Sequence, residues 1–292
     1  MTDRLGVFEE HRPMLLGIAY RMLGSVADAE DIVQDAWLRW DDVTGPVADP
    51  RAYLAKIVTN LSLNRLGSAA VRRESYVGSW LPEPLLTSPD VAEDVAAAES
   101  LANSLSMAVL VLLESLSPLE RAVFVLKEAF GFPYPDIAEA LDRSEAAVRQ
   151  VGHRARAHVH ARRPRFEASE EVGRRVTARF VAASMGGDIN AVMELLAPDV
   201  TMWSDGGGKV RAALRPITGA EKIARFLASV AGGFGGFEMR YAHVNGGPGV
   251  VMSKDGVLES VTGLDIADGR ITAIWLIRNP DKLRGLPQLD LM

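Results

Sequence analysis

The apolar residues of this chain change their spacing just past the middle, and this change restricts the folds open to it. Up to residue 163 they recur mostly at helical spacing; from about residue 168, helical segments precede short alternating runs separated by glycine-rich turns. The expected helices of this last part are 169–185, 188–197 and 219–230, and the expected strands are 238–245, 257–266 and 270–278. The order predicts two all-α parts followed by an α+β part with an antiparallel sheet.

Composition excludes several classes of protein. The chain has no cysteine, which removes disulfides, thiolate zinc sites and cysteine nucleophiles. No apolar run approaches the roughly 18 residues that a membrane-spanning helix needs, and the charged N-terminus lacks the apolar core of a signal peptide. We therefore expect a cytoplasmic protein with no bound metal and no cofactor.

Charge is distributed unevenly along the chain. The formal net charge of −6 is unlike that of a free-standing DNA-binding protein. Residues 74–103, however, hold six acids and no base, and residues 144–165 hold six arginines against Glu145 alone. The sequence thus predicts an acidic, proline-containing connector and a basic helix within one chain.

An amphipathic helix is expected over residues 28–40, because Ser25 and Asp28 fit a capping box ahead of it. One face carries Ile32, Val33, Ala36, Trp37 and Trp40, and the other carries Asp31, Gln34, Asp35, Leu38 and Arg39. The second face is either a solvated acidic surface or a binding surface for a basic partner. The apolar Leu38 among carboxylates favours the binding surface.

The next expected helix, over 50–66, has a polar face made of Lys56, Asn60, Asn64 and Arg65. Asparagine is a poor helix former, so two of them four residues apart require a reason. Amide side chains read base edges, and Lys and Arg neutralise phosphates. The alternative is a polar face with no further role.

Residues 134–163 have the pattern of a helix-turn-helix. A short helix over 135–141 is followed by a tight turn, and Ser144 is a good N-cap for a second helix. The expected buried face of that helix is Val148, Val151, Ala155 and Val159, and Arg149, Gln150, His153, Arg154 and Arg156 point largely elsewhere. In this motif the second helix enters the major groove. The alternative is an arginine-rich surface helix.

Three segments together, LLGIAYRMLGSVADAEDIVQDAWLRW, DPRAYLAKIVTNLSLNRL and LSPLERAVFVLKEAFGFPYPDIAEAL with the arginine-rich helix, resemble regions 2 and 4 of bacterial extracytoplasmic-function sigma factors. The resemblance implies a region 2 helical bundle over 1–72, the connector over 73–103 and a region 4 helix-turn-helix over 104–165. It also implies that the partners are core RNA polymerase and promoter DNA.

The resemblance assigns the candidate residues to three tasks. The residues implied in polymerase binding are Asp31, Gln34, Asp35, Leu38 and Arg39. Those implied in recognition of the −10 element are Lys56, Asn60, Asn64 and Arg65. Those implied in recognition of the −35 element are Ser144, Arg149, Gln150, His153, Arg154 and Arg156. The turn Leu141-Asp142-Arg143-Ser144 departs from a family pattern that often has glycine after the leucine, and Gly152 stands where a larger apolar residue is common.

Residues 168–292 resemble the SnoaL-like, nuclear-transport-factor-2-like α+β cone. The phrases WLPEP in the connector (Trp80, Leu81, Pro82, Glu83, Pro84), Asp205-Gly206-Gly207-Gly208-Lys209 and NPDKL at 279–283 look like signatures of the sigma-J-like subgroup, in which such a domain is fused to the factor. The resemblance implies regulation in cis and no dedicated anti-sigma protein.

The glycine triplet permits close approach of another backbone, so it is either a hairpin loop or a receptor for the connector. As a receptor it would bind Trp80 as the main anchor, with Glu83 facing Lys209.

An alternative function is a small-molecule sensor or isomerase-type enzyme that carries a DNA-binding module. Its candidate polar groups are Asp205, Arg240, His243 and Asp265, whose spacing specifies no reaction. That alternative leaves the acidic 28–40 helix unexplained, so we expect a transcription initiation factor and not an enzyme. An unidentified ligand in the cone domain stays open.

Overall fold

The computed structural model describes residues 3–87, 106–161, 169–233 and 235–286. The chain forms two compact units, and each is described by itself. The described residues of Met1–Ser75 and Val109–Arg163 make unit 1, and those of Tyr76–Ala108 and Pro164–Met292 make unit 2. The first residues of the connector therefore belong with the C-terminal part, although the sequence predicts a separate segment.

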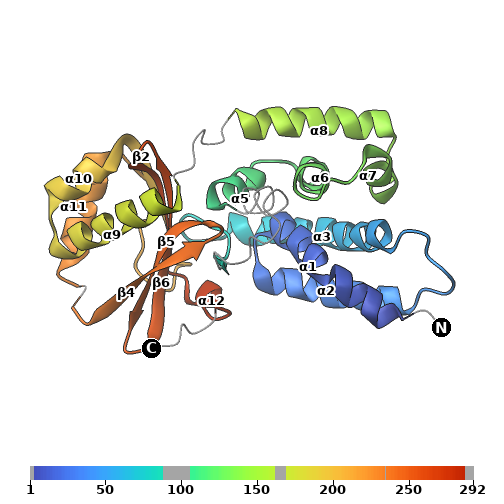
Figure 1. Ribbon diagram of the computed structural model, residues 1–292, viewed down its shortest axis with the longest axis horizontal. Helices are drawn as coiled ribbons and strands as arrows, with labels where there is room; N and C mark the ends of the chain where they lie inside the picture. Colours follow the sequence, from blue (N-terminus) through green and yellow to red (C-terminus); the bar gives the residue numbers. More distant parts are fainter. Residues whose placement is uncertain (1–2, 88–105, 162–168, 234, 287–292) are drawn as a thin grey trace. The chain divides into compact units, whose positions relative to one another are not determined.

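All the regular secondary structure among the described residues of unit 1 is helical (Figure 1). Its helices are α1 (Arg4–Leu23), α2 (Val26–Asp41), α3 (Pro50–Glu74), α6 (Pro118–Phe124), the π-helix η2 (Val125–Ala129), α7 (Tyr134–Ala140) and α8 (Glu145–His160). Helix α5 (Met107–Glu114) precedes α6 and spans the sequence boundary of the two units. Side-chain caps begin several of them: Ser25 accepts from Asp28 N, and Ser117 and Glu120 form a full capping box. Gly24, in the left-handed conformation, ends α1 and lets α2 turn back against it.

Helices α1, α2 and α3 pack on one another as a bundle, and α6, η2 and α7 pack on that bundle within the same unit. Helix α8 packs on α6 and α7. Two arginines, Arg21 and Arg121, are buried there, and burial lowers the pKa of each to about 10. Arg121 donates to Met22 O, an orphan carbonyl near the end of α1, at 2.7 Å and pairs with Glu114 at 2.9 Å. The expected helical bundle and helix-turn-helix are both present.

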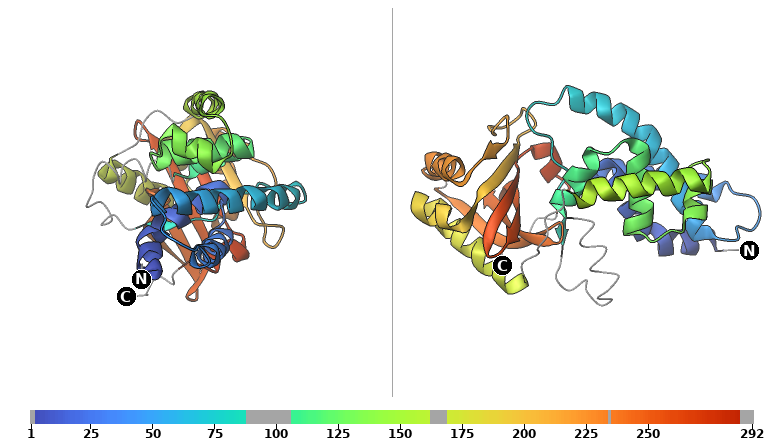
Figure 2. Two further views of the ribbon diagram at one scale, coloured as in Figure 1. Left: turned by 90° about the vertical axis from the view of Figure 1, so that its right-hand side faces the viewer. Right: turned by 90° about the horizontal axis from the view of Figure 1, so that it is seen from above.

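Unit 2 is an α+β domain with one seven-stranded sheet. The sheet order is β1-β4-β5-β6-β7-β2-β3, with β1 (Leu86–Thr87), β2 (Leu196–Asp205), β3 (Ile217–Thr218), β4 (Phe237–Val244), β5 (Gly247–Lys254), β6 (Val257–Ala267) and β7 (Arg270–Ile277). Helices α9 (Glu170–Gly186), α10 (Ile189–Leu195) and α11 (Ala220–Ala231) lie on one side of it, and the short α12 (Pro280–Leu283) follows β7 (Figures 1 and 2).

The sheet is not wholly antiparallel as expected, because β2 runs parallel to β7. Strand β2 also begins where a helix over 188–197 was expected, and β5 had no counterpart in the predicted strands. Three hairpin turns join the antiparallel strands, and in each an Asn or Asp with φ near +50° precedes a glycine with φ above +70°. Such paired left-handed residues match the twist of the flanking strands.

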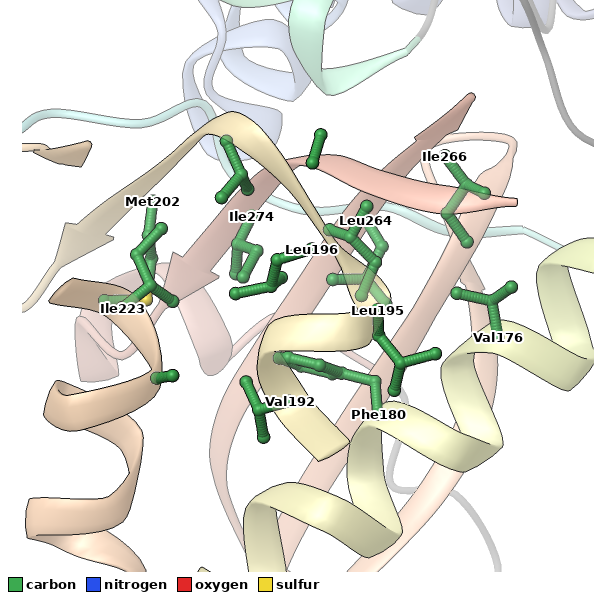
Figure 3. Packing of buried hydrophobic residues seen from close by; sticks show 14 of the residues in the cluster. Val176, Phe180, Val192, Leu195, Leu196, Met202, Ile223, Leu264, Ile266 and Ile274 are labelled. Atoms are coloured by element: carbon green, nitrogen blue, oxygen red, sulfur yellow. The ribbon is translucent and has the colours of Figure 1, made fainter. Parts of the chain in front are cut away.

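The core of unit 2 fills the space between the helices and the sheet. Val176 and Phe180 of α9 point toward Leu264 and Ile266 of β6, and Ile223 of α11 lies against Met202 of β2 (Figure 3). The side chains on the other face of the sheet include Trp203 and Trp275, which stack at 4.3 Å between ring centroids. That face also presents Asp205, at the end of β2.

Candidate functional sites

The expected polymerase-binding residues share one surface of α2. Asp31, Gln34, Asp35, Leu38 and Arg39 are all exposed, and Leu38 keeps 58% of its surface accessible. The opposite face of α2 is buried through Ala29, Ile32, Val33, Ala36 and Trp40. Asp31 differs from the others, because its carboxylate accepts from Arg65 at 3.1 Å. Helix α2 therefore presents an acidic surface with an apolar centre.

The expected −10 residues lie along α3, but they face different neighbours. Lys56 pairs with Glu139 of α7 at 3.2 Å, and Asn60 Nδ2 donates to Ala140 O at 3.0 Å. Arg65 turns toward α2, where it pairs with Asp28 at 2.5 Å, and these hydrogen bonds and charges raise the pKa of Arg65. Asn64 is exposed. The structure thus brings Lys56 and Asn60 together against α7 and separates Arg65 from them.

The expected −35 residues lie on the exposed side of α8. Ser144 is its N-cap and accepts from Ala147 N at 3.3 Å, and the four apolar residues expected on the buried face are buried. Arg149, Gln150, His153, Arg154 and Arg156 are exposed. Helix α8 therefore has one buried apolar face and one face rich in cations and amides.

All three arginines of this face have nearby carboxylates, and the longest of the three pairs joins Arg154 Nε to Glu120 Oε1 at 3.8 Å. Arg149 pairs with Glu145 one turn earlier at 2.5 Å, and its guanidinium lies 4.7 Å from the centre of the Tyr134 ring. Arg156 pairs with Glu128 at 2.5 Å, and that hydrogen bond raises its pKa. Exposed pairs of this kind are worth about 0–1 kcal/mol, so phosphate or base contacts can replace them.

Both departures from the family pattern have a structural explanation. Asp142 has a φ of +50°, the left-handed conformation for which glycine is the usual choice and which aspartate tolerates. Gly152 is buried, and a Cβ there would lie 3.1 Å from the Tyr134 hydroxyl and 3.3 Å from Val123. Glycine at 152 therefore lets α8 lie close to α6 and to Tyr134 of α7.

Within unit 2, the first residues of the connector meet the end of β2 at Asp205. This carboxylate is completely buried and accepts from Tyr76 Oη at 2.5 Å, Leu81 N at 2.9 Å and Gly207 N at 3.1 Å. Its counter-charge is the Lys282 ammonium of α12, 2.8 Å away and itself only 7% exposed. The same ammonium donates to Leu81 O. Both backbone polar groups of Leu81 are therefore bound by one buried ion pair.

Aromatic rings of the connector cover this ion pair. Lys282 Nζ lies 4.2 Å from the Trp80 ring centre and 5.2 Å from that of Tyr76. Asn279 donates to Tyr76 Oη at 2.8 Å. Burial, together with the adjacent Asp205, raises the pKa of the Tyr76 phenol. The buried apolar anchor is Leu81 and, with it, Pro82 and Pro84, whereas Trp80 is only half-buried.

The glycine triplet shapes this site. A Cβ on Gly207 would lie 2.4 Å from Asn279 Nδ2, and a Cβ on Gly208 would lie 3.1 Å from Val77. The expected pair between Glu83 and Lys209 is wrong, because Lys209 pairs with Asp281 at the surface. The buried cation is Lys282. The sequence placed Lys282 and Asn279 in the phrase at 279–283 without giving either a role, and Tyr76 was missed altogether.

The connector then extends the sheet of unit 2. Strand β1 pairs antiparallel with β4, with Leu86 opposite Val244 and Thr87 opposite His243. Asn245 bonds Leu85 twice, donating from its backbone at 2.8 Å and accepting at its side chain at 3.1 Å. Residues 76–87 are therefore bound to the C-terminal unit at two points, one ionic and one along a strand.

The polar residues considered for an enzyme or sensor do not converge. Arg240 and Asp205 belong to the same cross-strand row of the sheet, whereas His243 alternates to the other face, beside Tyr241 and 3.8 Å from Glu170. Asp265 accepts from Trp275 Nε1 at 3.1 Å. Among the residues that the structure describes, no group of three or more potential metal ligands occurs, and no helix is long and apolar enough to cross a membrane.

Known family models match three parts of the chain. The model for sigma-70 region 2 matches residues 7–72, that for sigma-70 region 4 matches 106–159, and that for a SnoaL-like domain matches 177–274.

Relatives align over nearly the whole length. The ECF RNA polymerase sigma factor SigJ of Mycobacterium tuberculosis is 41% identical, over 96% of this chain and 93% of its own. The probable ECF RNA polymerase sigma factor SigI of the same species is 31% identical, over 94% and 93%. The crystal structure of Mycobacterium tuberculosis SigJ superposes with a TM-score of 0.77 at 39% identity, covering 97% of this chain and 99% of that one. The chain therefore belongs to the extracytoplasmic-function family of RNA polymerase sigma factors, with a fused SnoaL-like domain.

Proposed function

We propose that this sigma factor, which directs core RNA polymerase to promoters, is regulated by its own C-terminal domain through the Asp205–Lys282 ion pair that holds the connector. The observation that supports this most is the binding of Leu81 at both its N–H and its C=O by a buried pair. Residues 73–103 join the two promoter-reading regions. A C-terminal domain that binds part of this connector limits the distance by which region 2 and region 4 can separate.

Polymerase binding is assigned to the exposed side of α2. Asp35 and Leu38 stand clear of the apolar side of the helix, and Leu38 supplies an apolar centre among charged groups. This arrangement fits a basic partner surface with a central apolar contact. Asp31 belongs to this surface as well, but a mutation there would also remove its ion pair with Arg65, so its effect on polymerase binding would be harder to interpret.

Recognition of the −35 element is assigned to α8. Arg149 and Gln150 lie in the N-terminal half of the helix, where this motif meets base edges, and His153 lies one turn after Arg149. We assign base reading to these three residues. Arg154 and Arg156 are assigned to the phosphates, which guanidinium groups bind without regard to sequence. Ser144 supports the helix by capping it.

Recognition of the −10 element is assigned to Lys56, Asn60 and Asn64 of α3. Asn64 is exposed, and the amide of Asn60 bonds a main-chain carbonyl that a base edge can replace. Arg65 is a weaker candidate than the sequence indicated, because both Asp28 and Asp31 bind it. Arg65 is better placed to hold α2 against α3.

The test is transcription reconstituted with core polymerase and the full chain. Asp205→Ala and Lys282→Met each remove one half of the buried pair, and Lys209→Ala removes a surface pair in the same loop region. The proposal expects the first two variants to change promoter output in the same direction and Lys209→Ala to leave it unchanged. If all three variants transcribe like the parent chain, the connector contact has no regulatory role.

The non-additivity of the two changes gives a second check. A double variant, Asp205→Ala with Lys282→Met, should change output by less than the product of the single effects, because both residues act through one contact. We also propose that no separate anti-sigma protein is needed, since the regulator is part of the same chain. Full dependence of repression on an added protein would contradict this.

A further inference from the structure

Helix α7 of region 4 lies against the part of α3 to which we assign −10 recognition. Lys56 Nζ contacts Glu139 at 3.2 Å, and Asn60 Nδ2 donates to Ala140 O at 3.0 Å. Both partners are at the C-terminal end of α7, where the last carbonyls lack helical partners. Within unit 1, therefore, region 4 occupies two of the groups that would meet DNA.

The contact between α7 and α3 is part of a larger interface between the segment around α7 and helices α1 and α3. Beside it, Arg51 of α3 donates to Phe130 O at 2.8 Å and lies 4.0 Å from the centre of the Phe132 ring. A Cβ added to Gly17 of α1 would lie 2.9 Å from the Phe130 ring, so that ring sits directly on α1. The segment leading into α7 is thus held on the region 2 bundle.

A buried arginine fixes the other end of this surface. Arg121 of α6 reaches Met22 O, and it is 3% exposed. Burial of a guanidinium costs free energy that acceptors offset, and Met22 O and Glu114 both accept from Arg121 Nη1, whereas the buried Nε has no hydrogen-bond partner among the described residues. The half-buried residues Lys56 and Asn60 thus lie at the edge of an interface that is buried at its centre.

We propose that α7 covers the −10-reading surface of α3 and competes with promoter DNA for Lys56 and Asn60. The inference rests on the proposed role of those two residues. While Lys56 and Asn60 bind α7, they are withheld from a phosphate and a base edge. DNA binding at α3 then requires α7 to move away, so the arrangement of unit 1 is a closed, self-inhibited one.

The exposure of the Lys56–Glu139 contact suits a reversible association of α7 with α3. The Lys56–Glu139 pair is solvent-exposed, with 38% and 78% of the two side chains accessible, and pairs of this kind are weak and screened by salt. Its loss therefore changes the balance between α7 and DNA without unfolding either region.

The first experiment measures binding of the free, full-length factor to fluorescent single-stranded DNA of randomised sequence. Glu139→Ala removes the partner of Lys56 and is expected to tighten binding about two- to fivefold, the range for losing one exposed ion pair. Asp136→Ala is the matched control, because it makes the same change in charge one turn earlier in α7, and it should leave binding unchanged. Equal affinities for Glu139→Ala and the parent chain, or equal gains for both variants, would overturn the proposal.

The second experiment fixes α7 in place. The chain has no cysteine, so Lys56→Cys with Glu139→Cys introduces a single pair of thiols, which a cleavable bismaleimide can join. DNA binding is measured on one preparation before and after cleavage of the linker, so the loss of Lys56 is common to both. Restored binding after cleavage supports the cover, and equal binding in both states refutes it.

A third set of variants separates a failure of the −10 assignment from a failure of the proposal about α7. Asn64 lies on α3 and is exposed, so Asn64→Ala tests −10 recognition without disturbing α7. If Asn64→Ala and Lys56→Ala both bind DNA and transcribe like the parent chain, the assignment of the −10 surface fails. If those variants lose binding while the linked and cleaved factor bind equally, only the cover fails.

Discussion

Removal of the Asp205 carboxylate should free the connector from the C-terminal unit. Asp205→Ala leaves the Lys282 ammonium 7% exposed and without its carboxylate partner, and it removes the acceptor of both Tyr76 Oη and Leu81 N. Breaking one half of a buried ion pair costs about 3–5 kcal/mol, because the remaining charge stays in a medium of low polarity. The local free energy of opening of the connector should fall by roughly that amount.

Hydrogen exchange measured by mass spectrometry reports this quantity segment by segment. Since each 1.4 kcal/mol is about a factor of ten, amides of residues 76–87 should exchange about 10²- to 4 × 10³-fold faster, up to the rate of an unprotected chain. Lys209→Ala is the matched control: its pair with Asp281 is at the surface, so its effect should stay within about fivefold. Exchange in strands β6 and β7 should not change in either variant.

Two results would refute this reasoning. One is an Asp205→Ala variant whose connector exchanges no faster than that of Lys209→Ala. The other is strict additivity of Asp205→Asn and Lys282→Met, because residues that share one ion pair should show a coupling energy. Lys282→Met alone serves as the second variant if Asp205→Ala does not fold.

Three further outcomes are expected. Asp35→Lys should abolish co-purification with core polymerase without loss of helicity, since Asp35 is exposed on α2, and the measurement is a pull-down with circular dichroism as control. Arg149→Ala should cost about 1–3 kcal/mol at one base position in a −35 library, whereas Arg154→Ala should weaken all sequences alike and reduce the salt slope. Because the pKa of Tyr76 is raised above its ordinary 10.0, its contribution to connector binding is present below pH 10 and is lost as pH rises through the higher folded value. In ultraviolet titration, Tyr76→Phe should therefore remove one late-ionising phenol.

Much of unit 1 follows from local patterns that the sequence displays openly. Caps at Ser25 and Ser144 and the apolar spacing of α8 are interactions among residues a few positions apart, so they can be recognised without knowledge of the fold. The left-handed turns in unit 2 are equally local, and the Asp268-Gly269 turn lies between the expected strands 257–266 and 270–278, where a glycine-rich turn was expected. The fold class and the order of domains depend on such features.

The residues that hold the connector show the limit of that reasoning. The phrase containing Asp205 was recognised and the approach of the connector was expected, but the sequence favoured Lys209 as the cation and Trp80 as the anchor. Lys282 and Tyr76 lie 77 and 129 positions from Asp205, and nothing in their local sequence marks which cation becomes buried. The parallel pairing of β2 with β7 brings Lys282, which follows β7, close to Asp205, and Tyr76 arrives with the connector.

The sequence by itself therefore determined the helices, the turns, the order of the three regions and the surfaces rich in charge. Those properties arise from backbone preferences and from the spacing of neighbouring side chains. Only the tertiary structure decided which charges are buried as pairs and that α7 meets Lys56 and Asn60. The physical reason is that desolvation and pairing depend on which distant segments meet, and a buried charge is tolerated only where its partner arrives from elsewhere in the chain.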